Sequence, residues 1–422
     1  MKLVLPLLAL ALSPLFVCAA PASERLKDAP VRSKDGPLDL SILEIVPATL
    51  DAVLVLGHEL LNSSSSELLP PSTSSSGESE FRLVCKDCPT SPISSGLRQS
   101  LRDKMVPFAG ATYCLSVQAG QWSCGALCDA HPDFEIVSYG GNGGKVPHYY
   151  IGWNPTSKEI VIAHEGSDFS QKDTFQNDFT FSGQVIDPRL AKTFHPVAGA
   201  QSASDIPVGA LALNLPKILI GDSELDYALV HTGFQSTWAR SYADIERVIL
   251  DLLAMHPDTA GILAAGHSLG AAIATLDGIA LRGAVPASVE VEVGVFGQPR
   301  LGNPIFASLV DRLMRDPDQR FKYHHVVKGT DIVPHLGPLI SGYQHSGSEV
   351  FIPTEESGPD AAAVLCSGQE NTNCAMNPDL KLGTKDHGGP YFGIHLGRDA
   401  GTLCNQDQSH RQGGRTNPGR QP

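Results

Sequence analysis

The pentapeptide GHSLG at positions 266–270 constrains this chain more than any other segment. It fits the G-x-S-x-G pattern, in which a buried strand turns sharply into a helix and exposes one serine. A side chain at Gly266 or Gly270 would collide with the neighbouring strand and helix. The apolar residues 262–265 predict the strand, and the small apolar residues 271–280 predict a buried helix. In that setting Ser268 is predicted to be a catalytic nucleophile.

A serine hydroxyl needs an adjacent base, which is itself oriented by a carboxylate. In the α/β-hydrolase arrangement these residues follow the serine in the order Asp, then His. Asp331 comes directly after a strand-like segment at 323–327 and is the candidate carboxylate. The alternative is a loop aspartate that only caps the next segment. His387, in a loop rich in Gly and Pro, is the favoured base over the other later histidines, His335, His345, His395 and His410.

The N-terminus has the pattern of a secretory signal peptide. Lys2 is followed by an apolar run over residues 3–17 and by small residues, which predicts cleavage after Ala19 or, alternatively, after Ala20. The apolar run is shorter than the roughly 20 residues that a membrane-spanning helix needs. We therefore expect residues 1–19 to be removed, the mature protein to be extracellular, and no stable insertion into a membrane.

Nine cysteines are present, and eight remain once Cys18 leaves with the signal peptide. An even number in a secreted chain predicts four disulfides. The alternative is zinc, because the C-x-x-C at 85–88 and the C-x-x-x-C at 124–128 have spacings typical of metal ligands. Secretion and the wide separation of the other cysteines favour disulfides, and we expect neither a metal nor another cofactor.

The charge of the chain limits its partners. The formal net charge is −14, and it becomes −15 when Lys2 is removed with the signal peptide. A strongly negative chain is a poor partner for nucleic acid or for an anionic membrane surface. The charge leaves the substrate open.

Composition changes at about residue 107. Residues 20–106 contain an apolar patch (38–61) and a Ser/Pro-rich stretch typical of a linker, which predicts an N-terminal extension or pro-segment. Beyond it, strand patterns alternate with helical ones, of which the clearest are strands at 151–153, 159–163, 291–296 and 323–327 and an amphipathic helix at 242–255. This alternation predicts an α/β fold with a mostly parallel central sheet and flanking helices over residues 107–404. A polar tail follows at 405–422.

These motifs resemble those of the fungal class 3 lipases, the filamentous-fungal triacylglycerol lipase family that also includes feruloyl esterases. Four segments are similar to the family's in the same order: GHSLG (266–270), GQPRLGNP (297–304), DIVPHL (331–336), and DH (386–387) followed by YFGI (391–394). The resemblance covers residues 107–404. It implies the α/β-hydrolase fold with a lid insertion and a catalytic triad of Ser268, Asp331 and His387.

The tetrahedral intermediate of ester hydrolysis needs hydrogen-bond donors for its oxyanion. One is the backbone N–H of Leu269, directly after the nucleophile. By resemblance the second is Ser167, where Glu165 replaces the family's more common Arg; the role of Glu165 is open, with a structural one expected. The family pattern also implies the disulfides Cys114–Cys404, Cys124–Cys128 and Cys366–Cys374, which leaves Cys85 and Cys88 either as a local bridge in the extension or as partners in a different pairing.

Residues 175–179 resemble the short lid helix of this family, inside an insertion over about residues 168–230 that contains an extra apolar piece at 206–220. That piece is interpreted either as an enlarged lid, since an exposed apolar patch invites a lipid partner, or as a packed insertion or retained untranslated segment. The resemblance implies a secreted triacylglycerol lipase that acts on lipid or ester substrates at an oil–water interface. The alternatives are a feruloyl esterase or other carboxylesterase on the same fold and, more remotely, a non-catalytic secreted binding protein.

Overall fold

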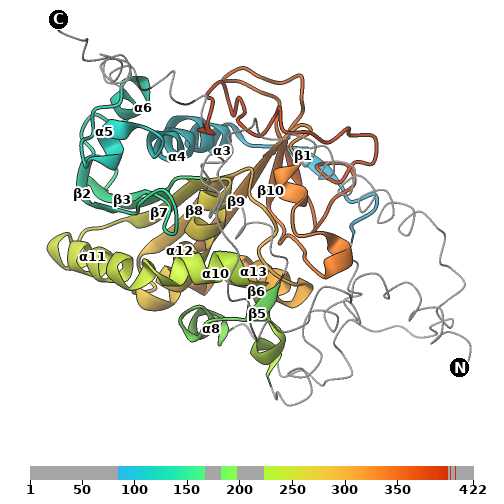
Figure 1. The fold of residues 1–422 in the computed structure, drawn as a ribbon, viewed down its shortest axis with the longest axis horizontal. Coiled ribbons are helices and arrows are strands. Elements are labelled where there is room, and N and C mark those ends of the chain that lie inside the picture. The colour runs from blue at the N-terminus through green and yellow to red at the C-terminus, as the bar shows by residue number, and fades with distance from the viewer. Residues whose placement is uncertain (1–83, 167–181, 197–222, 398–399, 401–403, 405–422) are drawn as a thin grey trace, which may run out of the picture. The chain divides into compact units, whose positions relative to one another are not determined.

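A nine-stranded sheet forms the centre of the structure (Figure 1), a computed structural model that describes residues 84–166, 182–196, 223–397, 400 and 404. The strand order is β1-β11-β10-β9-β8-β7-β4-β3-β2. The strands from β10 to β4 run parallel, whereas the strands at both edges pair antiparallel. The strand bounds are β1 Thr90–Pro92, β2 Glu135–Gly140, β3 Tyr149–Asn154, β4 Glu159–His164, β7 Gly261–His267, β8 Glu290–Phe296, β9 Phe321–Lys328, β10 Glu349–Ile352 and β11 Val364–Cys366. A separate antiparallel pair consists of β5 Gly183–Val185 and β6 Leu229–His231.

Helices cover both faces of this sheet (Figure 1). One face carries the earlier helical segments, α3 Ser95–Ser100, the π-helical η3 Leu101–Met105, α4 Val106–Ala111, α5 Leu115–Gln118 and α6 Ala126–Asp129. The other face carries α8 Pro188–Phe194, α10 Thr232–Ala239, α11 Tyr242–Met255, α12 Leu269–Ala284 and α13 Pro304–Arg315. Four short 3₁₀ segments are also described, η5 Glu224–Tyr227, η6 Pro317–Gln319, η7 Val333–His335 and η8 Leu339–Ser341.

Alternation along the central strands divides their side chains between two hydrophobic cores. In β4, Ile160 and Ile162 belong to the core under α8–α13, while Val161 and Ala163 belong to the core under α4–α6. Successive residues of a strand point to opposite faces, so a strand that is covered on both faces reads as a continuous apolar run. This explains why β4 and β7 carry polar residues only at their ends.

The predicted α/β fold with a mostly parallel central sheet is confirmed. The amphipathic helix expected at 242–255 is α11, whose buried residues repeat at helical spacing as Tyr242, Ile245, Ile249 and Leu252. The strands expected around 151–153, 159–163, 291–296 and 323–327 are β3, β4, β8 and β9, each extended by one to three residues.

The folded unit begins earlier than the change in composition near residue 107 indicates. Residues 90–92 form β1, which pairs with β11 at the edge of the main sheet. Leu101 and Met105 are fully buried in the core under α4. The region 20–106 therefore includes residues that the sheet and its core require.

All four disulfides expected from the sequence are present: Cys85–Cys88, Cys114–Cys404, Cys124–Cys128 and Cys366–Cys374. The alternative of a zinc site at 85–88 or 124–128 is wrong, because these cysteines are bonded to each other and have no thiolate to offer a metal. Cys85–Cys88 lies beside the main fold, where Cys85 forms a bridge with Asn371.

Several sequence predictions lie outside the described residues. These are the signal peptide and most of the extension (1–83), Ser167 and the lid-like segment (167–181), the apolar insertion (197–222) and the tail (405–422). Within the described part of the chain, no helix combines the length and the apolar character needed to traverse a lipid bilayer.

Candidate active site

Ser268 occupies a strained turn between the central strand β7 and helix α12. Its backbone φ is 59° and ψ is −127°, a combination that residues with a side chain rarely adopt. A Cβ at Gly266 would lie 2.3 Å from the carbonyl oxygen of Gly270, and one at Gly270 would lie 2.4 Å from the carbonyl oxygens at the end of β4. The first turn of α12 and the end of β4 therefore leave no space for a side chain at either glycine, as the sequence predicts.

His387 and Asp331 meet beside this turn. Asp331 follows β9 in a turn that its N–H closes onto the Lys328 carbonyl oxygen at 3.0 Å. Its Oδ2 lies 2.9 Å from His387 Nδ1, and its Oδ1 accepts a 2.9 Å hydrogen bond from the N–H of Val333. Because an ionised carboxylate only accepts, His387 Nδ1 donates this hydrogen bond, and in the neutral ring Nε2 is then the nitrogen with the lone pair. Among the described residues, nothing forms a hydrogen bond to this buried Nε2.

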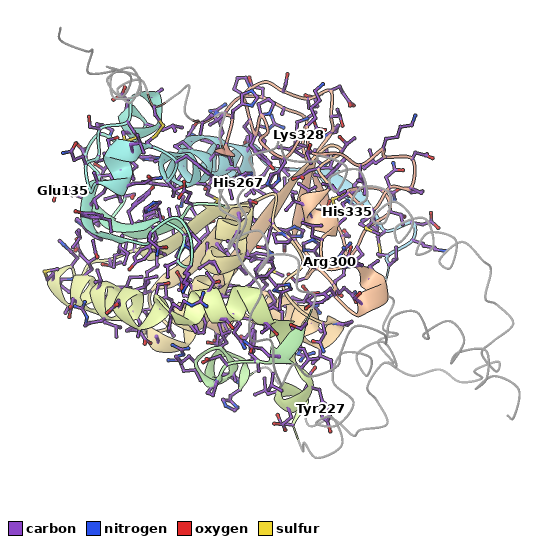
Figure 2. All side chains as sticks on the ribbon, viewed as in Figure 1. Glu135, Tyr227, His267, Arg300, Lys328 and His335 are labelled. Carbon is purple, nitrogen blue, oxygen red and sulfur yellow. A yellow bond between two sulfur atoms is a disulfide. The ribbon has the colours of Figure 1, made fainter. Side chains whose placement is uncertain are left out.

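Room for the pair comes from Gly297 at the end of β8. Its φ is +58°, and a Cβ there would lie 3.0 Å from Asp331 Oδ2 and 3.1 Å from His387 Cε1. The same carboxyl edge of the parallel sheet carries Ser268 after β7, because Ser268 N–H donates to the Phe296 carbonyl oxygen at 3.0 Å. Open α/β sheets bind ligands at this edge. His267 and Lys328, the last residues of β7 and β9, mark it in Figure 2.

A second contact ties the Asp331 loop to the His387 loop. Thr330 donates to Asp386 Oδ2 from its backbone N–H at 2.8 Å and from its hydroxyl at 2.9 Å. Each of these residues is the chain neighbour of one member of the Asp331–His387 pair. The two loops are therefore held together at two adjacent positions. Sequence reasoning missed this contact, because neither side chain belongs to a motif for nucleophilic catalysis.

A buried ion pair supports the same loop from the other side. Arg300 Nε and Nη2 lie 2.8 Å from the two carboxylate oxygens of Glu370, and both side chains are almost fully buried. Arg300 also donates to the carbonyl oxygens of His335 and Gly337, so it braces the turn that follows Asp331. The arginine belongs to the GQPRLGNP segment, but the sequence carried no signal for its partner, which is 70 residues away.

The expected oxyanion donors are only partly described. Leu269 is the first residue of α12, where backbone N–H groups have no intrahelical acceptor and are available to an anion. Ser167 lies outside the described residues. Gly166, directly before it, packs against the turn, since a Cβ there would lie 2.9 Å from Ser268 Cβ. Glu165 accepts a 3.1 Å hydrogen bond from Gln118 Nε2, which supports a structural role.

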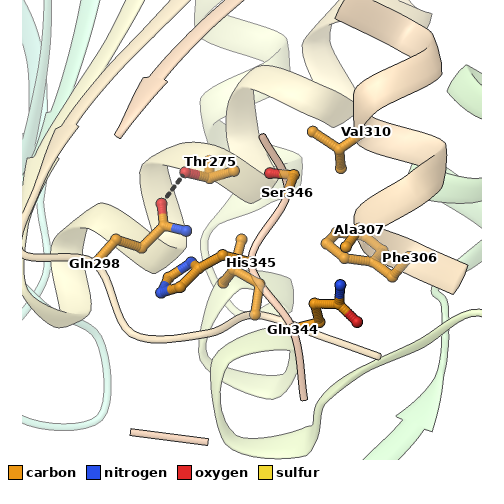
Figure 3. Close-up of a pocket in the computed structure, with 9 residues that line it drawn as sticks. Thr275, Gln298, Phe306, Ala307, Val310, Gln344, His345 and Ser346 are labelled. Atoms are coloured by element: carbon orange, nitrogen blue, oxygen red, sulfur yellow. Dashed lines mark hydrogen bonds between the residues drawn. The ribbon is translucent and has the colours of Figure 1, made fainter. Parts of the chain in front are cut away.

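Two other features are separate from this site. A pocket of about 10 Å³ beside α12 is lined by residues such as Thr275, Gln298 and His345, and it has room for about one water molecule (Figure 3). Glu349, Cys366 and Cys374 bring possible metal-binding atoms together, but the two cysteines form a disulfide. The chemistry that the described site can support is therefore that of a serine with an imidazole and a carboxylate.

Known proteins are similar to this chain over much of its length. A family model described as Lipase (class 3) matches residues 208–340. A secreted mono- and diacylglycerol lipase of Malassezia globosa is 35% identical over 145 residues, which are 34% of this chain and 45% of that protein. A lipase of Rhizomucor miehei is 26% identical over 289 residues, 68% of this chain and 66% of its own. The chain spans about half the length of the Malassezia relatives that it matches.

Solved structures agree with the fold. A fungal lipase–inhibitor complex, described as a model for interfacial activation in lipases, is 25% identical with a TM-score of 0.56. The similarity covers 75% of this chain and 100% of that one. Lipase II from Rhizopus niveus has a TM-score of 0.55 over 75% of this chain and, at 24% identity, is evidence for the fold alone.

Proposed function

Since the chain belongs to the class 3 lipase family, we propose that it is a secreted triacylglycerol lipase, which hydrolyses the carboxylic ester bonds of acylglycerols. The observation that carries the proposal is the strained, positive-φ Ser268 at the β7–α12 turn, at the same sheet edge as the Asp331–His387 hydrogen bond. Strain of this kind persists where the surrounding structure enforces it, and it is concentrated at functional sites.

Acylation starts when His387 Nε2 takes the proton of the Ser268 hydroxyl while its oxygen attacks the ester carbonyl carbon. Asp331 keeps the other ring nitrogen protonated and stabilises the imidazolium that forms. As the tetrahedral intermediate collapses, the C–O bond to the glycerol oxygen breaks and His387 gives that oxygen the proton. Water then attacks the acyl-enzyme by the same route, and the fatty acid leaves with Ser268 restored.

Charge develops on the carbonyl oxygen in both steps, and fixed donors are the largest source of stabilisation in such sites. The proposal assigns this role to the backbone N–H of Leu269 and to Ser167. The position of Leu269 at the start of α12 supports the first assignment, because the helix N-terminus carries partial positive charge. The second rests on the resemblance of the segment 164–167 to the family pattern.

The substrate is proposed to be an acylglycerol at an oil–water interface. The relatives named above are described as lipases, and one is named for mono- and diacylglycerols, which makes the number of acyl chains a question for experiment. The test is to follow fatty-acid release from tributyrin, triolein and diolein in a pH-stat, below and above the solubility limit of each substrate. Activity that rises sharply above the limit supports a lipase, and the ratio of triolein to diolein turnover settles the preferred substrate.

The serine is tested in the same assay. Ser268→Ala should abolish hydrolysis and covalent labelling by a fluorophosphonate. The control Ser157→Ala, at an exposed position in the turn between β3 and β4, should leave both intact. Saturating activity on soluble esters alone, with turnover of methyl ferulate, would favour the feruloyl esterase alternative. A folded protein that is neither active nor labelled would refute the hydrolase and leave a binding protein.

Secretion and removal of the leader are part of the proposal. They are supported by the signal-like residues 1–19 and by relatives named as secreted. N-terminal sequencing of protein recovered from the culture medium should begin at Ala20, or beyond it if the extension acts as a removable pro-segment. Retention of Met1 in the recovered protein would contradict the proposal.

A further inference from the structure

A chain of hydrogen bonds runs behind Ser268, from the loop of the proposed base to the end of β4. His267 Nε2 lies 2.8 Å from the backbone carbonyl oxygen of His387. On the other side of the ring, His267 Nδ1 lies 2.7 Å from the hydroxyl of Tyr113. That hydroxyl accepts a 3.0 Å hydrogen bond from the backbone N–H of Gly166. The catalytic proposal uses neither the His267 imidazole nor the Tyr113 hydroxyl.

The proton positions in this chain follow from its two ends. A backbone carbonyl only accepts, so His267 Nε2 must donate to His387. Burial holds the pKa of His267 well below 6.5, so the ring is neutral and its Nδ1 accepts. Tyr113 therefore donates its hydroxyl proton to Nδ1, while its oxygen accepts from Gly166. Each donor therefore has one acceptor, and the hydrogen bonds run in one direction, from Gly166 through Tyr113 and His267 to His387.

The elbow itself gives no reason for a histidine at position 267. Steric limits in this turn fall on Gly266 and Gly270, and the G-x-S-x-G pattern sets no residue type between Gly266 and Ser268. His267 is only 2% exposed, and burial of an imidazole is costly unless its nitrogens find partners. Both nitrogens do, in segments 154 residues earlier and 120 residues later.

We propose that His267 and Tyr113 are positioning residues for ester hydrolysis, which hold the His387 loop and the end of β4 in place around Ser268. The inference rests on the proposed function. Its geometry is that one end of the hydrogen-bond chain is the backbone of the base, and the other is Gly166, which packs against Ser268. A shift of either end changes the distance between nucleophile and base, and small misplacements of this kind are costly in rate.

Tyr113 is well anchored for such a role. It lies two residues beyond the end of α4, and its backbone N–H donates to the Gly110 carbonyl oxygen at 3.2 Å. The next residue, Cys114, is buried and linked to Cys404 by a disulfide. The backbone at Tyr113 is therefore held in place, and its hydroxyl can hold the His267 ring in one orientation.

Tyr113→Phe removes this hydroxyl and keeps the ring. We expect kcat on soluble p-nitrophenyl butyrate to fall by about tenfold, with KM changed by less than about twofold, because binding of the ester does not use the hydroxyl. The matched control is Tyr150→Phe. Tyr150 is buried and donates one 2.8 Å hydrogen bond, to the Phe108 carbonyl oxygen in the core under α4. The Tyr150→Phe variant should lose about as much thermal stability as Tyr113→Phe does, and its kcat should stay at the wild-type value.

His267 supplies a second variant. His267→Gln retains an amide donor for the His387 carbonyl, and His267→Phe retains only the packing of a ring. Gln should therefore keep more kcat than Phe, and its kcat should respond less to the added Tyr113→Phe change than the wild-type kcat does. The rate of fluorophosphonate labelling should follow the same order, since labelling needs the nucleophile and its base.

The outcomes separate the inference from the function. An active wild type whose Tyr113→Phe variant keeps its kcat, or whose Tyr150→Phe control loses as much, would overturn the inference and leave the lipase proposal intact. A wild-type protein that neither hydrolyses esters nor reacts with the phosphonate would overturn both.

Discussion

The free energy of unfolding of this protein is expected to fall as the pH rises from about 5 to about 8, and Glu349→Gln is expected to make that fall smaller. Glu349 is buried in β10, and its Oε1 accepts a 2.9 Å hydrogen bond from the N–H of Ala375. Burial raises the pKa of the Glu349 carboxyl from 4.5 to about 8, and the nearby charge of Glu370 adds to the rise. The folded state therefore keeps a proton that the unfolded chain releases.

The magnitude follows from this pKa. A carboxyl with a raised pKa stabilises the folded state fully at a pH below the unfolded value of 4.5, and that contribution is lost as the pH rises toward about 8. Each pKa unit corresponds to about 1.4 kcal/mol. Over three pH units, the free energy of unfolding should fall by up to about 4 kcal/mol because of this one group.

Urea unfolding without reductant, followed by tryptophan fluorescence at about pH 5, 6.5 and 8, measures this slope. Gln keeps the carbonyl acceptor for Ala375 and cannot ionise. Slopes are compared rather than absolute stabilities, because the amide adds donors of its own. Glu355→Gln, at an exposed carboxyl, is the control and should follow the wild type. If the Glu349→Gln curve runs parallel to the wild-type curve, the reasoning is refuted.

Three further predictions concern the site. Asp331→Asn should lower kcat roughly 10³- to 10⁴-fold with the fold retained, because an amide can donate to His387 Nδ1 and shift the ring proton to Nε2; hydrolysis kinetics and calorimetry check this. Gly270→Ala should lower the free energy of unfolding by about 1–3 kcal/mol and slow phosphonate labelling, because the new Cβ would lie 2.4 Å from two carbonyl oxygens. The control is Gly96→Ala, whose Cβ would have nothing within 4 Å and which should not destabilise the protein. Asp277, in α12, has its Oδ2 2.6 Å from Nε2 of the buried His164 at the end of β4, and Asp277→Ala should lower the free energy of unfolding by about 3 kcal/mol or more in denaturant titration.

Sequence reasoning succeeded where the physical constraint is local. The elbow is recognisable because Gly266 and Gly270 are needed within one turn of Ser268. The buried strands β4 and β7 are recognisable because both of their faces are apolar. The amphipathic α11 is recognisable from its helical repeat.

Prediction from the sequence failed where a strand or a side chain contacts a residue from a distant part of the chain. The folded unit was expected to start near residue 107, but β1 pairs with β11 more than 270 residues later, and a three-residue strand has no periodicity to detect. Glu370 was not singled out, because a single glutamate carries no signal until its partner Arg300 is placed beside it. The Thr330–Asp386 contact was missed for the same reason.

The sequence by itself determined the α/β class, the strained turn at Ser268 and the pattern of cysteine pairs, because these depend on backbone preferences, on hydrophobic periodicity and on family motifs. Only the tertiary structure decided that His387 meets Asp331 at 2.9 Å and that His267 and Tyr113 lie behind the turn. The physical reason is that a hydrogen bond depends on distance and direction between atoms. For residues 56 or 154 positions apart, the packed sheet sets that distance and the local sequence does not.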